Sequence, residues 1–342
     1  MADLEWTLTV NGDSTTLTND IISWEFSTSL DMIDALTVEV NSEDLGTRDK
    51  VIKLCQPGVT WALKVGTKNF SGDVVGVTWE SGKDGVLRLY LHGLEKLHRL
   101  RNQPLFEVAK TAPDKIAGSI GSKHAVTLTA TALTAPLRDS VLLDDTGLAW
   151  IKRLADSANY AIFLDGTSLK FAPRDVAGSG KACTVDYDLE VISTRIRTDL
   201  TEVATSVTVI GRDYMKDQAP FKYKSAAADL KKLSGTDTAI ALRNKTIGAL
   251  DMIIDHQGRY HSTSLATDRA KAELQRRAET FLSGSIVCKG VEASVATKVT
   301  LKNAPWPLKG PFFISGVTWS MNKGMELRTT LDVMSDSLPP NT

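Results

Sequence analysis

The stretch that decides the fold runs from Asp144 to Phe171 and reads DDTGLAWIKRLADSANYAIFLDGTSLKF. Asp144 and Asp145 are predicted to cap a helix, because carboxylates accept hydrogen bonds from the free amides of a first turn and favour its positive end. Apolar residues then recur at helical spacing on one face: Leu148, Ile151, Leu154, Ala155 and Ala158. Asn159 is predicted to end this amphipathic helix.

A tight hairpin is predicted directly after the helix. Residues 160–164 alternate as a strand, Asp165–Gly166 supplies a two-residue turn, and residues 168–171 return. The stretch therefore combines a helix and a hairpin in one small α+β unit.

A second helix and a short strand precede this unit. The helix is predicted to start at 111–114 and to end at Gly121, since glycine is a common helix terminator. Its apolar face would be Ile116, Ala117 and Ile120. With a strand at 126–130, these elements predict an α+β insertion over residues 103–175.

Residues 1–102 alternate as strands and are predicted to form a barrel. The expected apolar faces are Ile22, Trp24 and Phe26; Leu36, Val38 and Val40; Trp61, Leu63 and Val65; and Val75, Val77 and Trp79. About six or seven short strands with regular turns predict a closed or nearly closed antiparallel barrel. Closure would remove the exposed strand edges that an open sheet leaves.

Residues 176–342 return to strand patterns and predict a second barrel. The clearest strands are expected at 203–210, 285–292, 298–301, 312–319 and 326–333. The excursion 213–262 has no sustained period and is predicted to be a long loop, with a helix near 226–233. The predicted fold class is therefore mainly β: two tube-like antiparallel barrels, a small α+β domain and a flanking helix.

That flanking helix is expected over residues 264–283. Ser264 or Thr267 would cap it, and Leu274, Ala278 and either Phe281 or Leu282 would face inward. Lys271, Glu273, Gln275 and Arg276 are predicted to face water.

Bulk composition limits the function classes. The chain has 342 residues and a formal net charge of −1, so it lacks the overall basic balance of a dedicated nucleic-acid binder. Its N-terminus does not read as a secretory signal, and no run of about 18 apolar residues predicts a membrane-spanning helix. The three cysteines, Cys55, Cys183 and Cys288, are predicted to be buried free thiols.

No reactive constellation in the sequence predicts catalysis or a cofactor. Residues 118–123, GSIGSK, lack the spacing of a phosphate loop, and a G-x-S-x-G elbow does not occur. His256 and His261 are five apart, whereas the zinc-protease motif needs histidines four apart beside a glutamate. The Asp144–Asp145 pair is better explained by capping. Trp6, Trp24, Trp61 and Trp79 could form a stacking platform, but the sequence favours barrel core.

A basic group follows the first predicted barrel. It consists of Lys96, Arg99 and Arg101. It is either a solvated strand end or a patch that faces a neighbouring subunit or passing DNA.

Three sets of residues resemble a known family in the same order along the chain. The first comprises Trp150, Ile151, Arg153, Leu154 and Ala155 with Phe163, Asp165, Gly166 and Leu169. The second is residues 70–75, FSGDVV, followed by the strand at 87–97, and the third is residues 311–333, PFFISGVTWSMNKGMELRTTLDV. Together they resemble the late-control D-type tail hub proteins of contractile phages, to which the first part of type VI secretion spike proteins is related.

The resemblance implies a structural protein. It implies a baseplate hub in the virion tail, assembled in the host cytoplasm, in which a homotrimer with two barrels per subunit imitates a ring of six. The insertion would interrupt the barrels, so the first could borrow later strands. The expected partners are a separate spike protein, the tail tube protein and baseplate wedge proteins, with DNA or cargo passing through the lumen. A separate spike is expected because the chain has no piercing domain after residue 333.

Two alternatives stay open at this point. One is a tail-associated cell-wall hydrolase or carbohydrate-binding module, which clearing on a peptidoglycan zymogram would favour. The other is a fragment of a secretion-system spike that carries effectors, which neighbouring sheath and tube genes would argue against.

Overall fold

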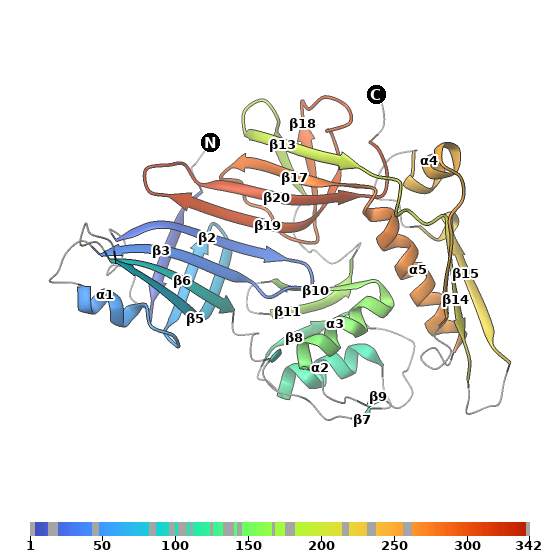
Figure 1. Ribbon diagram of the computed structural model, residues 1–342, viewed down its shortest axis with the longest axis horizontal. Coiled ribbons are helices and arrows are strands. Elements are labelled where there is room, and N and C mark those ends of the chain that lie inside the picture. Colours follow the sequence, from blue (N-terminus) through green and yellow to red (C-terminus); the bar gives the residue numbers. More distant parts are fainter. Residues whose placement is uncertain are drawn as a thin grey trace.

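The computed structural model describes residues 4–12, 20–42, 48–81, 87–95, 100–101, 108–109, 112–123, 126–132, 140–141, 146–165, 168–174, 182–213, 219–230, 237–255 and 262–339. Figure 1 shows a molecule built mostly of strands, with a helical insertion below the large sheet and a small sheet at one end. The described residues contain five α-helices. The prediction of a mainly β chain with an α+β insertion is confirmed.

A 12-stranded sheet dominates the fold. From the part of the chain before the insertion it takes β1 (Trp6–Val10), β2 (Ile21–Ser29), β3 (Ala35–Ser42), β4 (Thr60–Val65), β5 (Lys68–Ser81) and β6 (Leu87–Glu95). From the later part it takes β12 (Cys183–Asp186), β13 (Val191–Thr198), β17 (Leu282–Lys289), β18 (Lys298–Lys302), β19 (Phe312–Asn322) and β20 (Arg328–Ser335).

The two predicted barrel regions are joined within this one sheet. The main path of strands is β1-β4-β5-β6-β3-β2-β19-β20-β17-β13, and β18 attaches β12 to β19. Antiparallel pairing of β2 with β19 joins the early half to the late half. Among the described strands the pairings run as an open path, and closure of each half into a tube stays a prediction.

Aromatic side chains fill the core where the halves meet. Phe26 and Trp319 are cross-strand partners, and their rings stack with centroids 5.2 Å apart. Phe70 contacts Phe26 edge-on at 5.7 Å. The short helix α1 (Arg48–Leu54) closes the early half, where Trp61 donates its indole hydrogen bond to the carbonyl of Leu54 at 3.0 Å. One continuous hydrophobic core therefore spans both halves.

Two β-bulges change the apolar faces that alternation predicted. A register shift between Ile21 and Ser23 places Ile21, and not Ile22, in the core beside Trp24 and Phe26. A second shift between Val74 and Gly76 buries Val74 and leaves Val75 44% exposed. Trp79, predicted to be core, lies on the core side as the cross-strand partner of Leu89 but is 46% exposed. A bulge adds one residue to a strand, so strict alternation fails beyond it.

The insertion packs two helices on a three-stranded sheet. Its elements are α2 (Pro113–Lys123), β8 (Leu128–Ala130), α3 (Gly147–Ala158), β10 (Tyr160–Asp165) and β11 (Ser168–Pro173). Strands β7 (Val108–Ala109) and β9 (Ser140–Val141) form a separate pair. The predicted hairpin is confirmed, because Asp165 pairs with Ser168. Residues 166–167 lie outside the described part of the chain.

The ends of the insertion helices differ in part from the prediction. Thr146, and not an aspartate, is the N-cap of α3, and its hydroxyl accepts from the amide of Ala149. Asp144 and Asp145 lie outside the described residues. Asn159 ends α3 in a left-handed conformation, as predicted. Gly121 does not end α2; a Cβ there would lie 3.0 Å from the Cβ of Leu128, so its role is close packing against the sheet.

Strand β10 is buried on both of its faces. Tyr160, Ile162 and Leu164 belong to the core of the insertion, together with Ile151 of α3 and Ile116 of α2. Ala161 and Phe163 point the other way and belong to the main core. The insertion is thus attached to the body through a strand that both cores share.

Residues 206–279 build a second small unit rather than a long loop. It contains β14 (Ser206–Gly211), β15 (Phe221–Ala226), the 3-10 turn η3 (Ala227–Asp229), α4 (Ala239–Thr246), β16 (Asp251–Asp255) and α5 (Thr263–Glu279). The sheet order is β15-β14-β16, and α5 packs against β14 and β15. Of the helix predicted near 226–233, only η3 lies in the described residues. The predicted domain boundaries stay predictions.

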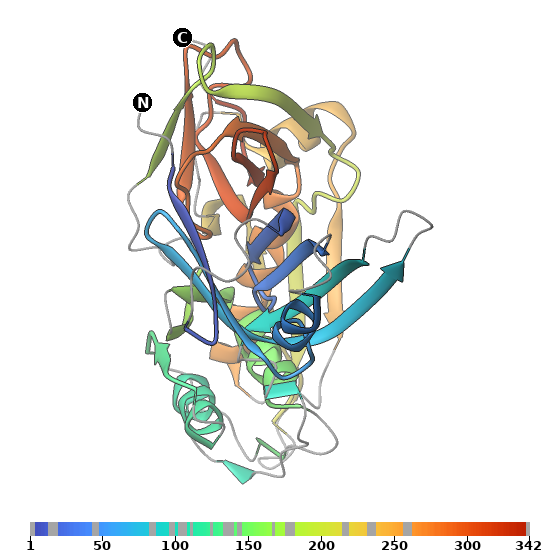
Figure 2. The same cartoon turned by 90° about the vertical axis from the view of Figure 1, so that its left-hand side faces the viewer.

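Helix α5 is the flanking helix that the sequence predicted. Its N-cap is Ser262, whose hydroxyl accepts from the amide of Leu265, and not Ser264 or Thr267. Leu274, Ala278, Phe281 and Leu282 are buried as predicted. Gln275 is only 5% exposed, which contradicts the prediction that it faces water. Figures 1 and 2 show the reason: α5 lies between the small sheet, the insertion and the large sheet.

Candidate functional site

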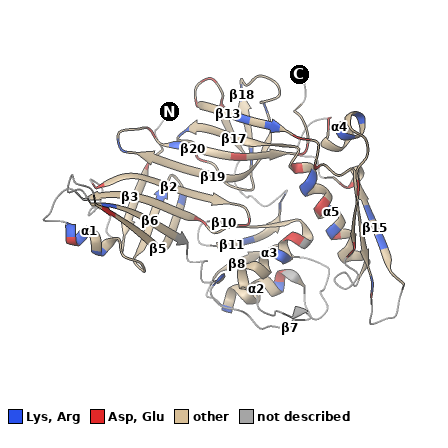
Figure 3. Cartoon of the chain, in the orientation of Figure 1, with Lys and Arg blue, Asp and Glu red and all other residues tan. Residues whose placement is uncertain are grey.

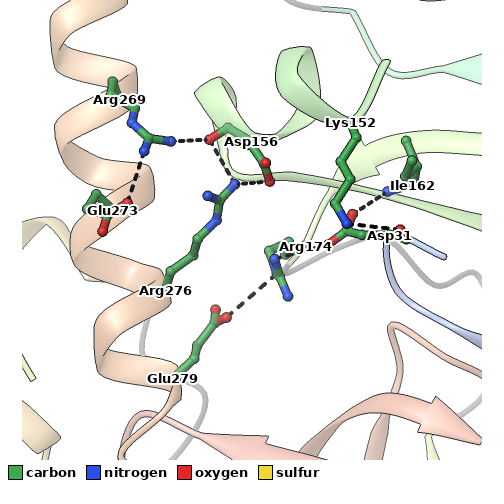
Figure 4. Close-up of polar contacts among 9 residues, drawn as sticks. All are labelled: Asp31, Lys152, Asp156, Ile162, Arg174, Arg269, Glu273, Arg276 and Glu279. Atoms are coloured by element: carbon green, nitrogen blue, oxygen red, sulfur yellow. Dashed lines mark hydrogen bonds and ion pairs between the residues drawn. The ribbon is translucent and has the colours of Figure 1, made fainter. Parts of the chain in front are cut away.

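A cluster of charged side chains lies where α5, the insertion and the β2–β3 turn meet. We call it the polar junction, and it comprises Asp31, Asp156, Arg174, Arg269, Glu273, Arg276 and Glu279 (Figure 4). Figure 3 shows that α5 carries both signs of charge along its length. A helix that contacts three other layers has no wide solvent face, so its charged residues must pair with one another or with neighbouring elements.

Two arginines of α5 bind the end of α3. Arg269 donates to the carbonyl oxygen of Asp156 at 2.9 Å, and Arg276 donates to the same oxygen at 2.8 Å and to Oδ1 at 2.6 Å. Glu273 orients both neighbours along the helix, since it pairs with Arg269 at 3.2 Å and with Arg277 at 2.9 Å. The last carbonyls of a helix lack intrahelical partners, and here the arginines supply donors.

A third arginine joins the β2–β3 turn to the end of α5. Arg174, just after β11, lies 3.6 Å from Asp31 Oδ2 and 3.7 Å from Glu279 Oε2. Asp31 has a positive φ of 62° and exchanges hydrogen bonds with Ile162: its amide donates to the carbonyl at 2.8 Å, and its Oδ1 accepts from the amide at 3.2 Å. Lys152 of α3 donates to the Asp31 carbonyl at 3.3 Å.

Burial governs the electrostatics of the junction. Glu279 is 6% exposed, and burial raises its pKa above the usual value although Arg174 opposes the shift. Burial also lowers the pKa of Arg276. Gln275 extends the network, because its amide donates to Asp336 Oδ2 at 3.3 Å. These contacts hold four segments in one arrangement. They position elements of the fold relative to one another.

The solvent face of the large sheet is a second candidate site. Cross-strand partners form a row over five strands: Arg328, Ser320, Glu25, Thr37 and His92. Thr37 and His92 are hydrogen-bonded at 3.3 Å between Oγ1 and Nδ1. The row crosses the β2–β19 joint without interruption and carries both signs of charge. A face of this composition suits contact with water or with a passing polar molecule.

The predicted basic patch is only partly within the described residues. Arg101 is exposed, whereas Lys96 and Arg99 lie outside the described part of the chain. The patch therefore stays a prediction. Residues 118–123, which lack the spacing of a phosphate loop, are the second half of α2.

The cysteines are free thiols, as predicted. Cys55 and Cys288 are buried, and Cys183 is half-buried. Within the described ranges, no group of three or more His, Cys, Asp or Glu residues could hold a metal ion. His256 and His261 fall outside those ranges. A membrane-spanning helix is likewise not found among the helices that the structure describes.

Comparison with known proteins gives a consistent result at the level of fold. No family model and no curated protein matches the sequence. The prophage MuSo2 43 kDa tail protein from Shewanella oneidensis is 14% identical with a TM-score of 0.72, covering 97% of this chain and 98% of that one. The tail protein from Neisseria meningitidis MC58 is 13% identical with a TM-score of 0.72, covering 98% and 97%.

A third solved structure links the same fold to secretion. The E. coli c3393 protein, described as a component of the type VI secretion system that is similar to the T4 tail proteins gp27 and gp5, is 10% identical. Its TM-score is 0.61, covering 97% of this chain and 79% of that one. The chain thus has the fold of phage tail proteins and of a type VI secretion component, and the predicted resemblance is confirmed in structure.

Proposed function

We propose that the chain is the structural baseplate hub of a contractile phage tail or of a related injection particle. Three copies form a ring that joins the spike to the tail tube. The observation that carries the proposal is the match over 97% and 98% of both chains with a phage tail protein, which includes the insertion and the small sheet as well as the large one. The proposal assigns the chain no catalytic role.

The polar face of the large sheet has a place in this proposal. In a ring, one sheet face of each copy lines the central channel. The row alternates charged or imidazole side chains with hydroxyl side chains, in the order Arg328, Ser320, Glu25, Thr37 and His92. Such a row offers no apolar patch to which DNA or protein cargo would bind. We assign this face to the lumen.

The polar junction supports the same role. A part that connects a spike to a tube must transmit force without changing shape. Arg174, Arg269 and Arg276 tie the insertion and α5 to the body, so the outer units are held rigidly for contacts with wedge proteins.

The mass of the assembly that the purified chain forms in solution tests the proposal. The purified chain, alone and mixed with its candidate spike protein, should give a trimer mass by light scattering at micromolar concentration. Ring interfaces of this obligate kind bury more than about 2,000 Å² in total. Only monomers in both samples would count heavily against a hub. Clearing on a peptidoglycan zymogram, lost on changing one carboxylate, would favour an enzyme instead.

A further inference from the structure

Strand β5 extends beyond the strand that covers one of its edges. It has 14 residues, but β4 pairs only with Lys68–Asp73. Val74 is still held, through hydrogen bonds with Gly58 and Val59. From Gly76 to Ser81, β5 pairs only with β6 among the described residues. Figure 2 shows this distal part of the β5–β6 hairpin standing out from the body. One edge of the strand is therefore open.

The open edge carries apolar side chains on the core side of the sheet. Val77 and Trp79 are cross-strand partners of Leu91 and Leu89, both of which are buried. Trp79 is nevertheless 46% exposed, because no neighbouring strand within the described chain covers it. Proteins normally shield such an edge with charges, prolines or a covering element. An open edge with an uncovered core-side tryptophan marks a strand-addition site.

The solvent side of the same edge is acidic. Glu80 is exposed and lies opposite Arg88 of β6. A partner strand at this edge must therefore place a positive or neutral group beside Glu80, and an apolar group beside Trp79.

Strand β13 meets both requirements. It is the last strand of the main path and pairs only with β17 among the described strands. Ile196 lies on its core side, as the cross-strand partner of Gly284. On its solvent side Arg195 and Arg197 are exposed. The other free edges of the large sheet do not fit: β1 carries Thr7 and Thr9 on its solvent side, and β12 ends on Asp186.

We propose that residues 76–81 of β5 pair with β13 of a second copy of this chain. The inference rests on the proposed ring and names its contact: core-side Val77 and Trp79 meet Ile196, and Glu80 meets Arg195. Pairing of β5 with itself would give Glu80 no basic partner, because residues 76–81 contain no Lys or Arg. β5 and β13 lie on different sides of the molecule in Figure 1, so the contact is head-to-tail, the kind that forms a ring when its rotation closes.

Charge exchange tests the contact. Glu80→Arg and Arg195→Glu are each expected to weaken self-association by about tenfold or more, because each places like charges at the interface. The double variant with both changes is expected to recover association, since it restores opposite charges. Glu25→Arg is the matched control: Glu25 is exposed on the same face, but β2 is paired on both edges. Sedimentation velocity over a concentration series gives the association constants.

Trp79→Ser provides a second variant. Trp79 is already half exposed, so this variant should keep the circular dichroism spectrum of the native chain while losing association. Three results separate the two proposals. Native trimers that are unaffected by Glu80→Arg, or a double variant no better than the single ones, overturn the β5–β13 contact and leave the hub intact. A native chain that stays monomeric at every concentration and with its spike overturns the hub as well.

Discussion

The guanidinium of Arg276 donates to two oxygens of Asp156, the main-chain carbonyl at 2.8 Å and the carboxylate at 2.6 Å. Asp156 lies in the last turn of α3, where the amide of Asn159 already serves the carbonyl of Ala155. The Asp156 carbonyl is thus one of the unpartnered carbonyls of a helix end, and α5 satisfies it from outside. Arg269 donates to the same oxygen. Side chains of α5 therefore supply the hydrogen-bond donors that the C-terminal end of α3 lacks.

Removing this donor should destabilise the chain measurably. Arg276→Met keeps the aliphatic stem but leaves the Asp156 carboxylate without its cation, with an expected loss of about 2 kcal/mol in the free energy of unfolding. Lys271→Met is the control on the same helix. Lys271 pairs with Asp229 and its side chain is 45% exposed, so its loss should cost about 0.5 kcal/mol. Urea unfolding measures both, and equal losses would contradict the special role of Arg276.

The buried Glu279 should make stability fall as pH rises. Burial raises its folded-state pKa above the ordinary value of 4.5, so the folded chain holds this proton more tightly than the unfolded chain. Its contribution is fully present below pH 4.5 and is lost as pH rises through the folded pKa. Glu279→Gln has no titrating carboxyl at this position. The free energy of unfolding of the native chain, relative to that of the variant, should therefore decrease from pH 4 to pH 8. Denaturant unfolding at each pH measures this difference, with Glu202→Gln as the surface control. A difference between the native chain and Glu279→Gln that stays constant with pH would refute the prediction.

Gly284 is required where β17 passes β13. A Cβ at this position would lie 2.0 Å from the carbonyl oxygen of Arg195, a contact that no side chain can make without moving backbone. Gly284→Ala should therefore cost about 3 kcal/mol or prevent β13 from pairing. Gly118→Ala is the opposite case, because nothing lies within 4 Å of its Cβ in the middle of α2. That variant should gain about 0.5 to 1 kcal/mol in thermal or urea unfolding.

The three thiols should be nearly inert in the native chain. Burial raises the pKa of Cys55 and Cys288 to about 12 and that of Cys183 to about 11, so little thiolate exists at pH 8. Alkylation should be slow for Cys183, roughly 100-fold below an ordinary thiol, and slower for the other two. In 6 M urea all three should react. Mass spectrometry after timed iodoacetamide labelling reads the sites, and rapid native labelling of Cys55 or Cys288 would contradict the burial.

Local patterns predicted elements well and packing environments less well. The face of α3, the stop at Asn159, the β10–β11 hairpin and the closing β19–β20 hairpin all follow from spacing, because they depend on neighbouring residues. Val75 and Ile22 were misplaced because a bulge shifts the register of each strand, and no local signal in the sequence marks it. Trp79 lies on the predicted side of the sheet but is 46% exposed, because no described strand covers that edge. The excursion after residue 213 was predicted as loop because β14 and β16 pair in parallel across α4, a contact distant in sequence.

The polar junction could not have been predicted from α5 alone. Its charged residues recur at positions that a surface helix would turn to water, and only the presence of three packing neighbours makes Glu279 and Gln275 interior. The predicted basic patch stays a prediction, because Lys96 and Arg99 lie outside the described residues. Sequence spacing identifies which residues share a helix face, whereas the fold determines whether that face is exposed to solvent.

Strand β10 also limits how this architecture can be rebuilt. Because Ile162 faces one core and Phe163 the other, the segment cannot be excised or grafted as a self-contained module without opening a hole in the body that remains. An engineered variant of this chain should accept new sequence at exposed hairpin tips and keep residues 160–164 fixed.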